Sequence, residues 1–287
     1  MAQRLQVSIT LSGLARLFGA SLSGVIETAV AAEAAGIDQI AVPDHLALGP
    51  RTDRYPYGRF PLPPDEPWLE PLATLAAIAG ATRRIRLATG VLIAPLRPAI
   101  LLAKTAATLD VLSQGRLDLG VGIGWQVEEY TASGVPFEGR AARMDDQLRA
   151  CRALWSGEAA SFRSPTVSFD DLVCLPRPQQ PGGPPIWFGI APTPRNAQRI
   201  AELGAGWLPI GSDLEEIARG VAVLRRAFER AGRDPATLGV RAHAPSPDAL
   251  EELREAGVTI AAFGLARCAH SRAELPGLFE RLGALAR

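Results

Sequence analysis

Short hydrophobic runs alternate with longer amphipathic stretches along the whole chain. The runs are three to six residues long and nearly continuous, as expected of parallel strands that are covered on both faces. Because a helical stretch follows each run, the pattern predicts an α/β fold. Eight runs of this kind predict strands, at residues 6–10, 39–42, 86–91, 117–122, 186–189, 206–208, 240–244 and 259–263.

The stretches between these runs have the spacing of amphipathic helices. Capping patterns predict that helices begin near Ser212, Ser246-Pro247 and Ser271, and Gly257 predicts the end of the second of these helices. Two hydrophobic stripes recur at intervals of three and four residues, which places each on one helical face: Ile217, Val221, Leu224 and Phe228, and Met144, Leu148, Cys151 and Trp155.

Eight strands that alternate with helices favour a (β/α)8 barrel, the TIM barrel, over an open doubly wound sheet. Two connections are longer than this alternation requires: residues 46–68, which are rich in Pro, Tyr and Arg, and residues 159–184. Segments this long in a compact domain commonly serve a binding site. No low-complexity linker divides the chain, which predicts one domain over residues 1–287 with long loops after strands two and four.

The composition disfavours several classes of protein. The chain has 30 Lys+Arg and 30 Asp+Glu, so its net charge is zero, and neither nucleic acid nor a membrane surface is an expected partner. Three widely spaced cysteines without a CxxC pair predict neither a disulfide framework nor a zinc site. Residues 1–11 lack the apolar core of a signal peptide, and no apolar run has the length of a membrane span. We therefore expect a cytoplasmic protein.

Candidate catalytic residues follow the second predicted strand, because the active site of such a barrel lies at the C-terminal ends of its strands. Asp44-His45 stands there, and an imidazole can exchange a proton near neutral pH, although a structural histidine fits the position equally well. His243 also lies near a strand end but without a neighbouring motif, and His270 is expected to face solvent. No metal site is expected, because only three histidines are present and none has ligand spacing.

A glycine-rich run, Gly120-Val121-Gly122-Ile123-Gly124, closes the fourth predicted strand. It lacks both the G-x-G-x-x-G spacing and the following acidic residue of a Rossmann dinucleotide site, so that interpretation is rejected. Glycines without Cβ atoms would let a flat ring lie against the strand end, although tight turns require the same residue. Both explanations stay open on this evidence.

Several segments, in their order and spacing, resemble the luciferase-like flavin and deazaflavin oxidoreductases. The likeness is greatest to the short subgroup that is usually described as probable F420-dependent oxidoreductases. The segments that carry it are Val42-Pro43-Asp44-His45, residues 81–91, 103–105 and 108–116, residues 119–125 with Glu128-Glu129, and residues 176–180, 185–189 and 206–209.

The resemblance implies a TIM barrel that holds a flavin-type ring at its C-terminal mouth. It places the ring on a bulge of strand three with a non-proline cis peptide bond at Gly90-Val91, and it places Asp44-His45 beside the redox centre. A phosphate is expected at a loop and helix start after strand five, where free N–H groups and Arg195 suit an anion. The cofactor-binding residues expected in this way are Thr89, Gly90, Val91, Gly122, Gly124, Trp125, Gly189, Ile190, Ala191, Thr193 and Arg195.

Two positions depart from the pattern of the family. Trp125 stands where some sugar-phosphate-oxidising members have a catalytic glutamate, so that activity is not expected. Ile190-Ala191 replaces the second glycine of the phosphate loop, which changes how closely its backbone can approach a phosphate.

The expected function is hydride transfer between F420 and an unknown small organic substrate. His45 would exchange the proton, Asp44 would orient it, and residues 46–68 would cover the substrate. An FMN-dependent monooxygenase is the alternative within the family, and a barrel that only stores or senses a flavin is the alternative outside catalysis. Because similar proteins commonly dimerise, a homodimer is also expected.

Overall fold

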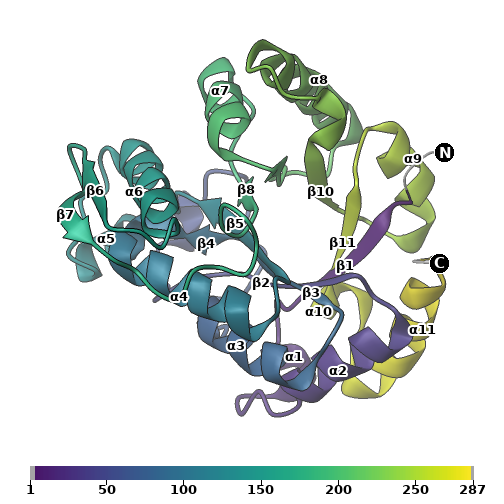
Figure 1. Cartoon of the computed structure of the whole chain (residues 1–287). Helices are drawn as coiled ribbons and strands as arrows, with labels where there is room; N and C mark the ends of the chain where they lie inside the picture. The colour runs from purple at the N-terminus through teal and green to yellow at the C-terminus, as the bar shows by residue number, and fades with distance from the viewer. Residues whose placement is uncertain (1–3, 286–287) are drawn as a thin grey trace.

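The computed structural model describes residues 4–285, and its strands form a closed barrel surrounded by helices (Figure 1). All strand pairs of the barrel are parallel, β1 pairs with both β2 and β11, and pairing of β3 with β5 completes the ring. The TIM barrel predicted from the sequence is confirmed. Its strands are β1 (Gln6–Thr10), β2 (Gln39–Val42), β3 (Arg86–Thr89) continued by β4 (Leu92–Ile93), β5 (Leu117–Gly122), β8 (Ile186–Phe188), β9 (Gly206–Trp207), β10 (Gly239–His243) and β11 (Ile260–Gly264).

Helices follow the strands and cover the outside of the barrel (Figure 1). Both predicted hydrophobic stripes are buried in the main hydrophobic core, whose residues extend from Val7 to Leu282. Residues 1–3 and 286–287, which belong to the predicted domain, lie outside the described residues. The helices are α1 (Ala15–Phe18), α2 (Val25–Ala35), α3 (Pro71–Ala81), α4 (Ala99–Leu112), α5 (Val127–Ala132), α6 (Arg140–Leu154), α7 (Pro194–Leu203), α8 (Leu214–Arg230), α9 (Leu250–Glu255), α10 (Leu265–Cys268) and α11 (Leu275–Leu285).

Two local predictions need correction. The third strand is not continuous over residues 86–91: β3 ends at Thr89, and β4 resumes the pairing with β5 after a bulge. Helix α8 begins one residue later than predicted, because the Asp213 carboxylate, rather than the Ser212 hydroxyl, accepts a hydrogen bond from the Glu216 N–H at 2.8 Å. A carboxylate is the stronger acceptor at a helix N-terminus, where the helix dipole also favours negative charge.

The second long connection contains structure that the sequence pattern did not predict. Within residues 159–184, β6 (Ala160–Arg163) and β7 (Ser168–Leu172) form an antiparallel hairpin beside α6 (Figure 1). Stacked Phe162 and Phe169 rings, 6.0 Å apart, join its strands, and Thr166 donates a hydrogen bond to Asp146 of α6 at 2.7 Å. The segment therefore packs on the side of the barrel.

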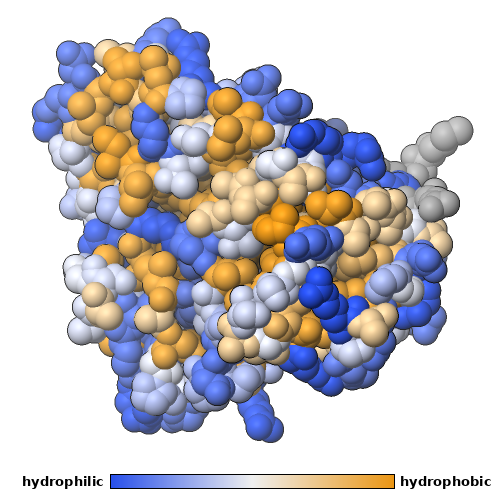
Figure 2. Space-filling view, turned by 90° about the horizontal axis from the view of Figure 1, so that it is seen from below, coloured by the Kyte–Doolittle hydropathy of each residue, from blue (hydrophilic) through white to orange (hydrophobic). Residues whose placement is uncertain are grey.

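Hydrophobic side chains are exposed on one side of the molecule. Figure 2 shows several such patches on its left, which is the side of α4 and β7 in Figure 1. Lys104 of α4 donates a hydrogen bond to the Leu175 carbonyl, so α4 and the segment after β7 adjoin. Patches of this kind mark interaction surfaces, and the homodimer stays a prediction. The exposed hydrophobic side chains of α4 and of the segment after β7 include Ile100, Leu101, Leu112, Val173 and Leu175. Within residues 4–285, no helix combines the length and apolar character needed to cross a membrane.

A carboxylate ties helix α2 to the chain that enters β3, at the barrel end opposite the strand C-termini. Glu33 accepts hydrogen bonds from the backbone N–H groups of Arg83, Arg84 and Ile85, at 2.6–3.1 Å. Partial burial acts to raise the pKa of Glu33, but the three N–H donors outweigh it and hold the pKa below its usual range.

We predict that Glu33→Gln lowers the free energy of unfolding by about 1 kcal/mol at neutral pH, since Glu33 is partly exposed. A lowered pKa stabilises the fold fully above the pKa of an unfolded glutamate, about 4.3, and this contribution is lost as the pH falls through the lower folded value. Urea unfolding at several pH values should therefore show the difference from wild type shrinking in acid. Glu229→Gln, at an exposed position, is the control; an equal loss there, or a gap that is constant with pH, contradicts the assignment.

Candidate active site

A large cavity opens at the C-terminal end of the barrel. Its volume is about 1520 Å³, which exceeds the roughly 300–1,000 Å³ of a typical small-molecule site and leaves room for a cofactor together with a substrate. Every strand of the barrel contributes a residue at or just after its C-terminal end: Thr10, Pro43, Gly90, Gly122, Gly189, Trp207, His243 and Gly264.

The long loop after β2, residues 46–68, covers one side of this cavity. It packs there through aromatic rings: Tyr55 lies edge-on to Phe60 and to Trp125, with ring centroids 5.2 Å apart in both pairs. Phe60 and Trp125 are 5.4 Å apart. Each aromatic pair of this kind contributes about 0.5–1.5 kcal/mol beyond its buried area, so the rings give the cavity an apolar wall. The predicted position of this loop over the site is confirmed.

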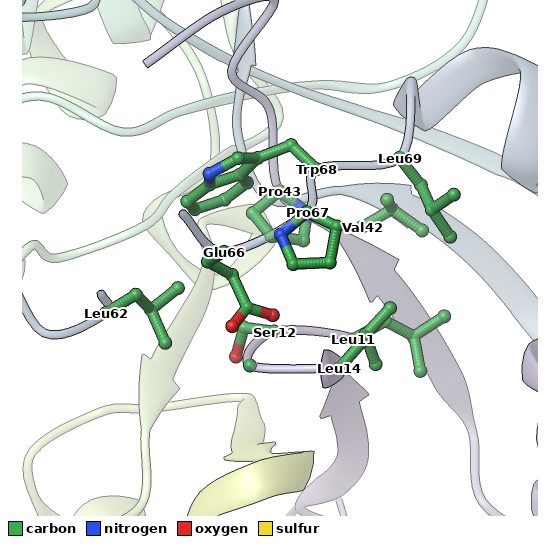
Figure 3. Close-up of a pocket in the computed structure, with 11 residues that line it drawn as sticks. Leu11, Ser12, Leu14, Val42, Pro43, Leu62, Glu66, Pro67, Trp68 and Leu69 are labelled. Atoms are coloured by element: carbon green, nitrogen blue, oxygen red, sulfur yellow. The ribbon is translucent and has the colours of Figure 1, made fainter. Parts of the chain in front are cut away.

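The end of the same loop is fixed to the barrel. Figure 3 shows the carboxylate of Glu66 pointing toward Ser12, and Glu66 accepts a hydrogen bond from the N–H of Ala15 at 3.2 Å. The pocket that remains there measures only about 10 Å³, so the loop end packs closely on the ends of β1 and β2. Its lining includes Leu62, Pro67 and Trp68 of the loop and Leu11, Leu14 and Pro43 of the barrel.

His45 lies on the cavity wall and is oriented by a carboxylate. Its Nδ1 is 3.0 Å from Glu129 Oε2, and because a carboxylate only accepts, Nδ1 carries the proton. Glu129, which is buried in α5, also accepts the N–H of Leu46 at 2.6 Å. Nε2 of His45 has no hydrogen-bond partner among the described residues. The pair therefore presents one imidazole nitrogen to a ligand.

The Asp44 carboxylate is not hydrogen-bonded to the His45 ring, contrary to the expectation that it orients the ring. Its carboxylate accepts two hydrogen bonds from the Arg97 guanidinium, at 2.6 and 3.1 Å, and one from the N–H of Ile93 at 2.8 Å. Burial acts to lower the pKa of Arg97, but its bonds to Asp44 and Glu70 raise it. The sequence identified Glu129 only as a residue that matches the family, because 84 residues separate it from His45.

The bulge after β3 is built as the resemblance implied, with a cis peptide bond between Gly90 and Val91. The neighbouring glycines have a role that differs from the expected one. A Cβ atom on Gly122 or on Gly189 would lie 2.7 Å from a methyl group of Val91. These glycines therefore make room for Val91 and so shape the floor of the cavity beneath a ligand.

The comparison with known proteins decides the family. The sequence matches the family described as Luciferase-like monooxygenase over residues 5–273. The chain belongs to this luciferase-like family. It is thus an oxidoreductase of the luciferase-like class, as the resemblance implied.

Relatives extend over most of the chain. An uncharacterized protein of Mycobacterium tuberculosis is 37% identical over 240 residues, covering 82% of this chain and 84% of that protein. The F420-dependent hydroxymycolic acid dehydrogenase of the same organism is 34% identical over 222 residues, covering 76% and 57%. A solved F420-dependent secondary alcohol dehydrogenase, in complex with an F420-acetone adduct, has a TM-score of 0.78 at 16% identity, covering 99% of this chain and 100% of that one. The last likeness shows the fold.

Most, but not all, of the expected cofactor-binding residues line the cavity. Thr89 is buried and donates a hydrogen bond to the Gly120 carbonyl, Thr193 caps α7, and Arg195 is exposed. These three do not line the cavity, and their contacts to a cofactor stay predictions. No residue of the hairpin segment 159–184 lines it either, so the expectation that this segment serves the site is wrong. The expected residues that do line it are Asp44, His45, Gly90, Val91, Gly122, Gly124, Trp125, Gly189, Ile190 and Ala191.

Two polar residues of β10 reach the cavity without having been identified from the sequence as site residues. His243, which the sequence places near a strand end without a motif, lines the cavity with an exposed side chain, and its enclosure by the mouth together with the nearby Arg241 and Arg267 lowers its pKa. His243 is thus neutral near pH 7. Arg241 was not singled out, although a charge within a hydrophobic strand was a signal that could have found it. Among residues 4–285, no three acidic, histidine or cysteine side chains are grouped to hold a metal.

We predict that Gly122→Ala disturbs the bulge, because its Cβ would overlap Val91. Overpacking should cost about 1–3 kcal/mol of stability and weaken cofactor binding about tenfold, measured by urea unfolding and by titration with cofactor. Adding Val91→Ala should restore much of both. Gly80→Ala, in helix α3 with open space around its Cβ, is the matched control. If the double variant is no better than Gly122→Ala, the steric explanation fails.

Proposed function

We propose that this protein is an F420-dependent oxidoreductase that transfers a hydride between the deazaflavin and a small organic substrate. The observation that carries the proposal is that His45, held by Glu129, and the Gly90–Val91 bulge line one cavity, which is large enough for two molecules. The F420-dependent hydroxymycolic acid dehydrogenase, which is 34% identical, supports F420 over FMN.

The residues of the cavity fit a flat ring system. The bulge gives it a floor, Trp125 and Phe60 give it an aromatic wall, and the buried Arg241 gives it a cation. The chemistry supplied by bound F420 is hydride transfer to or from a carbon atom, which requires a proton to move on the substrate side.

His45 would move that proton. When a hydroxyl group of the substrate is oxidised to a carbonyl, its carbon gives up the hydride and its oxygen gives the proton to Nε2; in the reverse direction Nε2 returns it. Glu129 holds Nδ1–H and so keeps Nε2 as the nitrogen that exchanges the proton. Asp44, through Arg97 and the Ile93 N–H, fixes the backbone from which His45 projects.

We further propose a cytoplasmic homodimer. The three cysteines are free thiols, which suits a reducing compartment, and the exposed hydrophobic surface of α4 and the segment after β7 suits a second copy of the chain.

The cofactor is tested by incubating the purified protein with F420 or with FMN and recording the absorbance spectrum after desalting. We expect F420 to stay with the protein and FMN to be removed, since the proposal rests on F420-dependent relatives. Retention of FMN instead, together with oxygen consumption by the FMN-reduced protein, would identify the alternative, an FMN-dependent monooxygenase.

The role of His45 is tested by His45→Gln, with turnover followed as the change in deazaflavin absorbance over a panel of secondary alcohols. We expect kcat to fall by about 10²–10⁴-fold, because a positioned acid–base group contributes this much, while F420 still binds. Glu129→Gln should lower kcat by about 10–100-fold with little change in KM, since it acts through His45. His270→Gln, at an exposed histidine, is the control. Full turnover by His45→Gln with bound F420 would remove its catalytic role.

A further inference from the structure

Arg241 of β10 lies at the floor of the cavity with only 5% of its surface exposed. Its Nη2 donates a hydrogen bond to the hydroxyl of Thr10 at 2.8 Å, and its Nε donates to the hydroxyl of Ser8 at 3.3 Å. The remaining nitrogen, Nη1, has no hydrogen-bond partner among the described residues. It lies 3.0 Å from the position where Gly90 would carry a Cβ, and hence directly beside the bulge.

Within residues 4–285, the guanidinium has no ion-pair partner of its own. Asp118 favours its charged form, but the Asp118 carboxylate is already bound by Arg86, at 2.6 and 2.8 Å, and by Gln39 at 2.8 Å. Burial lowers the pKa of Arg241 to about 10, which still leaves it a cation at neutral pH. A buried cation held only by two neutral hydroxyls is costly unless an anionic group from a ligand completes it.

We propose that Arg241 is an anion-binding residue for the cofactor ring, and that it pairs with the ring edge that becomes negative when the ring is reduced. The inference rests on the proposed function, because it requires a ring on the Gly90–Val91 bulge. Two-electron reduction of a flavin or deazaflavin makes its N–C=O edge electron-rich, and this edge readily loses a proton. A fixed cation beside that edge stabilises the reduced form more than the oxidised form.

A carboxylate on the substrate is a second candidate for the anion that pairs with Arg241. The position of Nη1 beside Gly90 favours the ring, since the ring rests on the bulge while the substrate must lie on its far side. The experiment separates the two sources by measuring cofactor binding with no substrate present.

The test compares Arg241→Met, Arg241→Lys and wild type, each titrated anaerobically with oxidised and with reduced F420. We expect Arg241→Met to lose about tenfold in its preference for the reduced form, which is ~30 mV in the two-electron potential of the bound cofactor. Arg241→Lys keeps the charge and should retain most of the preference. Arg267→Met, which removes an exposed arginine at the cavity rim, should change the preference by less than about threefold, because solvent screens its charge.

An unchanged preference in a folded Arg241→Met overturns the inference. If the preference of Arg241→Met is unchanged but its F420 complex no longer binds acetate, Arg241 is assigned to a substrate carboxylate instead. Thr10→Val serves if Arg241→Met does not fold: it removes the hydroxyl that holds Nη2, and a loss in the same direction supports the inference, whereas no loss overturns it. If wild type binds neither form of F420 nor FMN, the proposed function itself has failed, and the inference fails with it.

Discussion

The buried ion pair between Asp44 and Arg97 is the contact on which the geometry of the site depends. It joins the end of β2 to the backbone of β4 through the N–H of Ile93, and to the start of α3 through Glu70. His45 is the next residue along the chain from Asp44, so its backbone position follows from this pair. Removing Arg97 would leave the Asp44 carboxylate buried without a cation, which typically costs about 3–5 kcal/mol. Asp44 thus acts on the chemistry indirectly, by fixing the position of His45.

Many residues that carry the family resemblance belong to the fold and not to the reaction. Arg116 is buried at the N-terminal end of the barrel and donates hydrogen bonds to the carbonyls of Ala79, Thr82 and Ile85. Asp110 binds the backbone and side chain of Gln180. The barrel therefore separates its two ends: hydrogen-bonded loops at one end hold the strands together, and open polar groups at the other face a ligand.

The elements of the fold could be predicted because their signals are local. A short hydrophobic run predicts a strand. The stripe that includes Ile217 and Phe228 predicts a helix from a repeat of three or four residues. The partners in the site could not be predicted in this way. Glu129 is 84 residues from His45, and Arg97 is 53 residues from Asp44, so only the closure of the barrel brings them together. The hairpin at residues 160–172 escaped prediction because its strands are short and mostly exposed.

The loop over the cavity, residues 46–68, is held by hydrogen bonds near both of its ends. Gln126 and Glu129 of the α5 region hold its first residues, and Glu66 holds its last. The stretch between these points lines the cavity with aromatic side chains such as Tyr55 and Phe60, and also with Arg59 and Leu62. Divergence in this stretch can thus alter which molecules are admitted while His45 keeps its place. Related enzymes built on this scaffold can therefore keep one redox step and differ in their substrates.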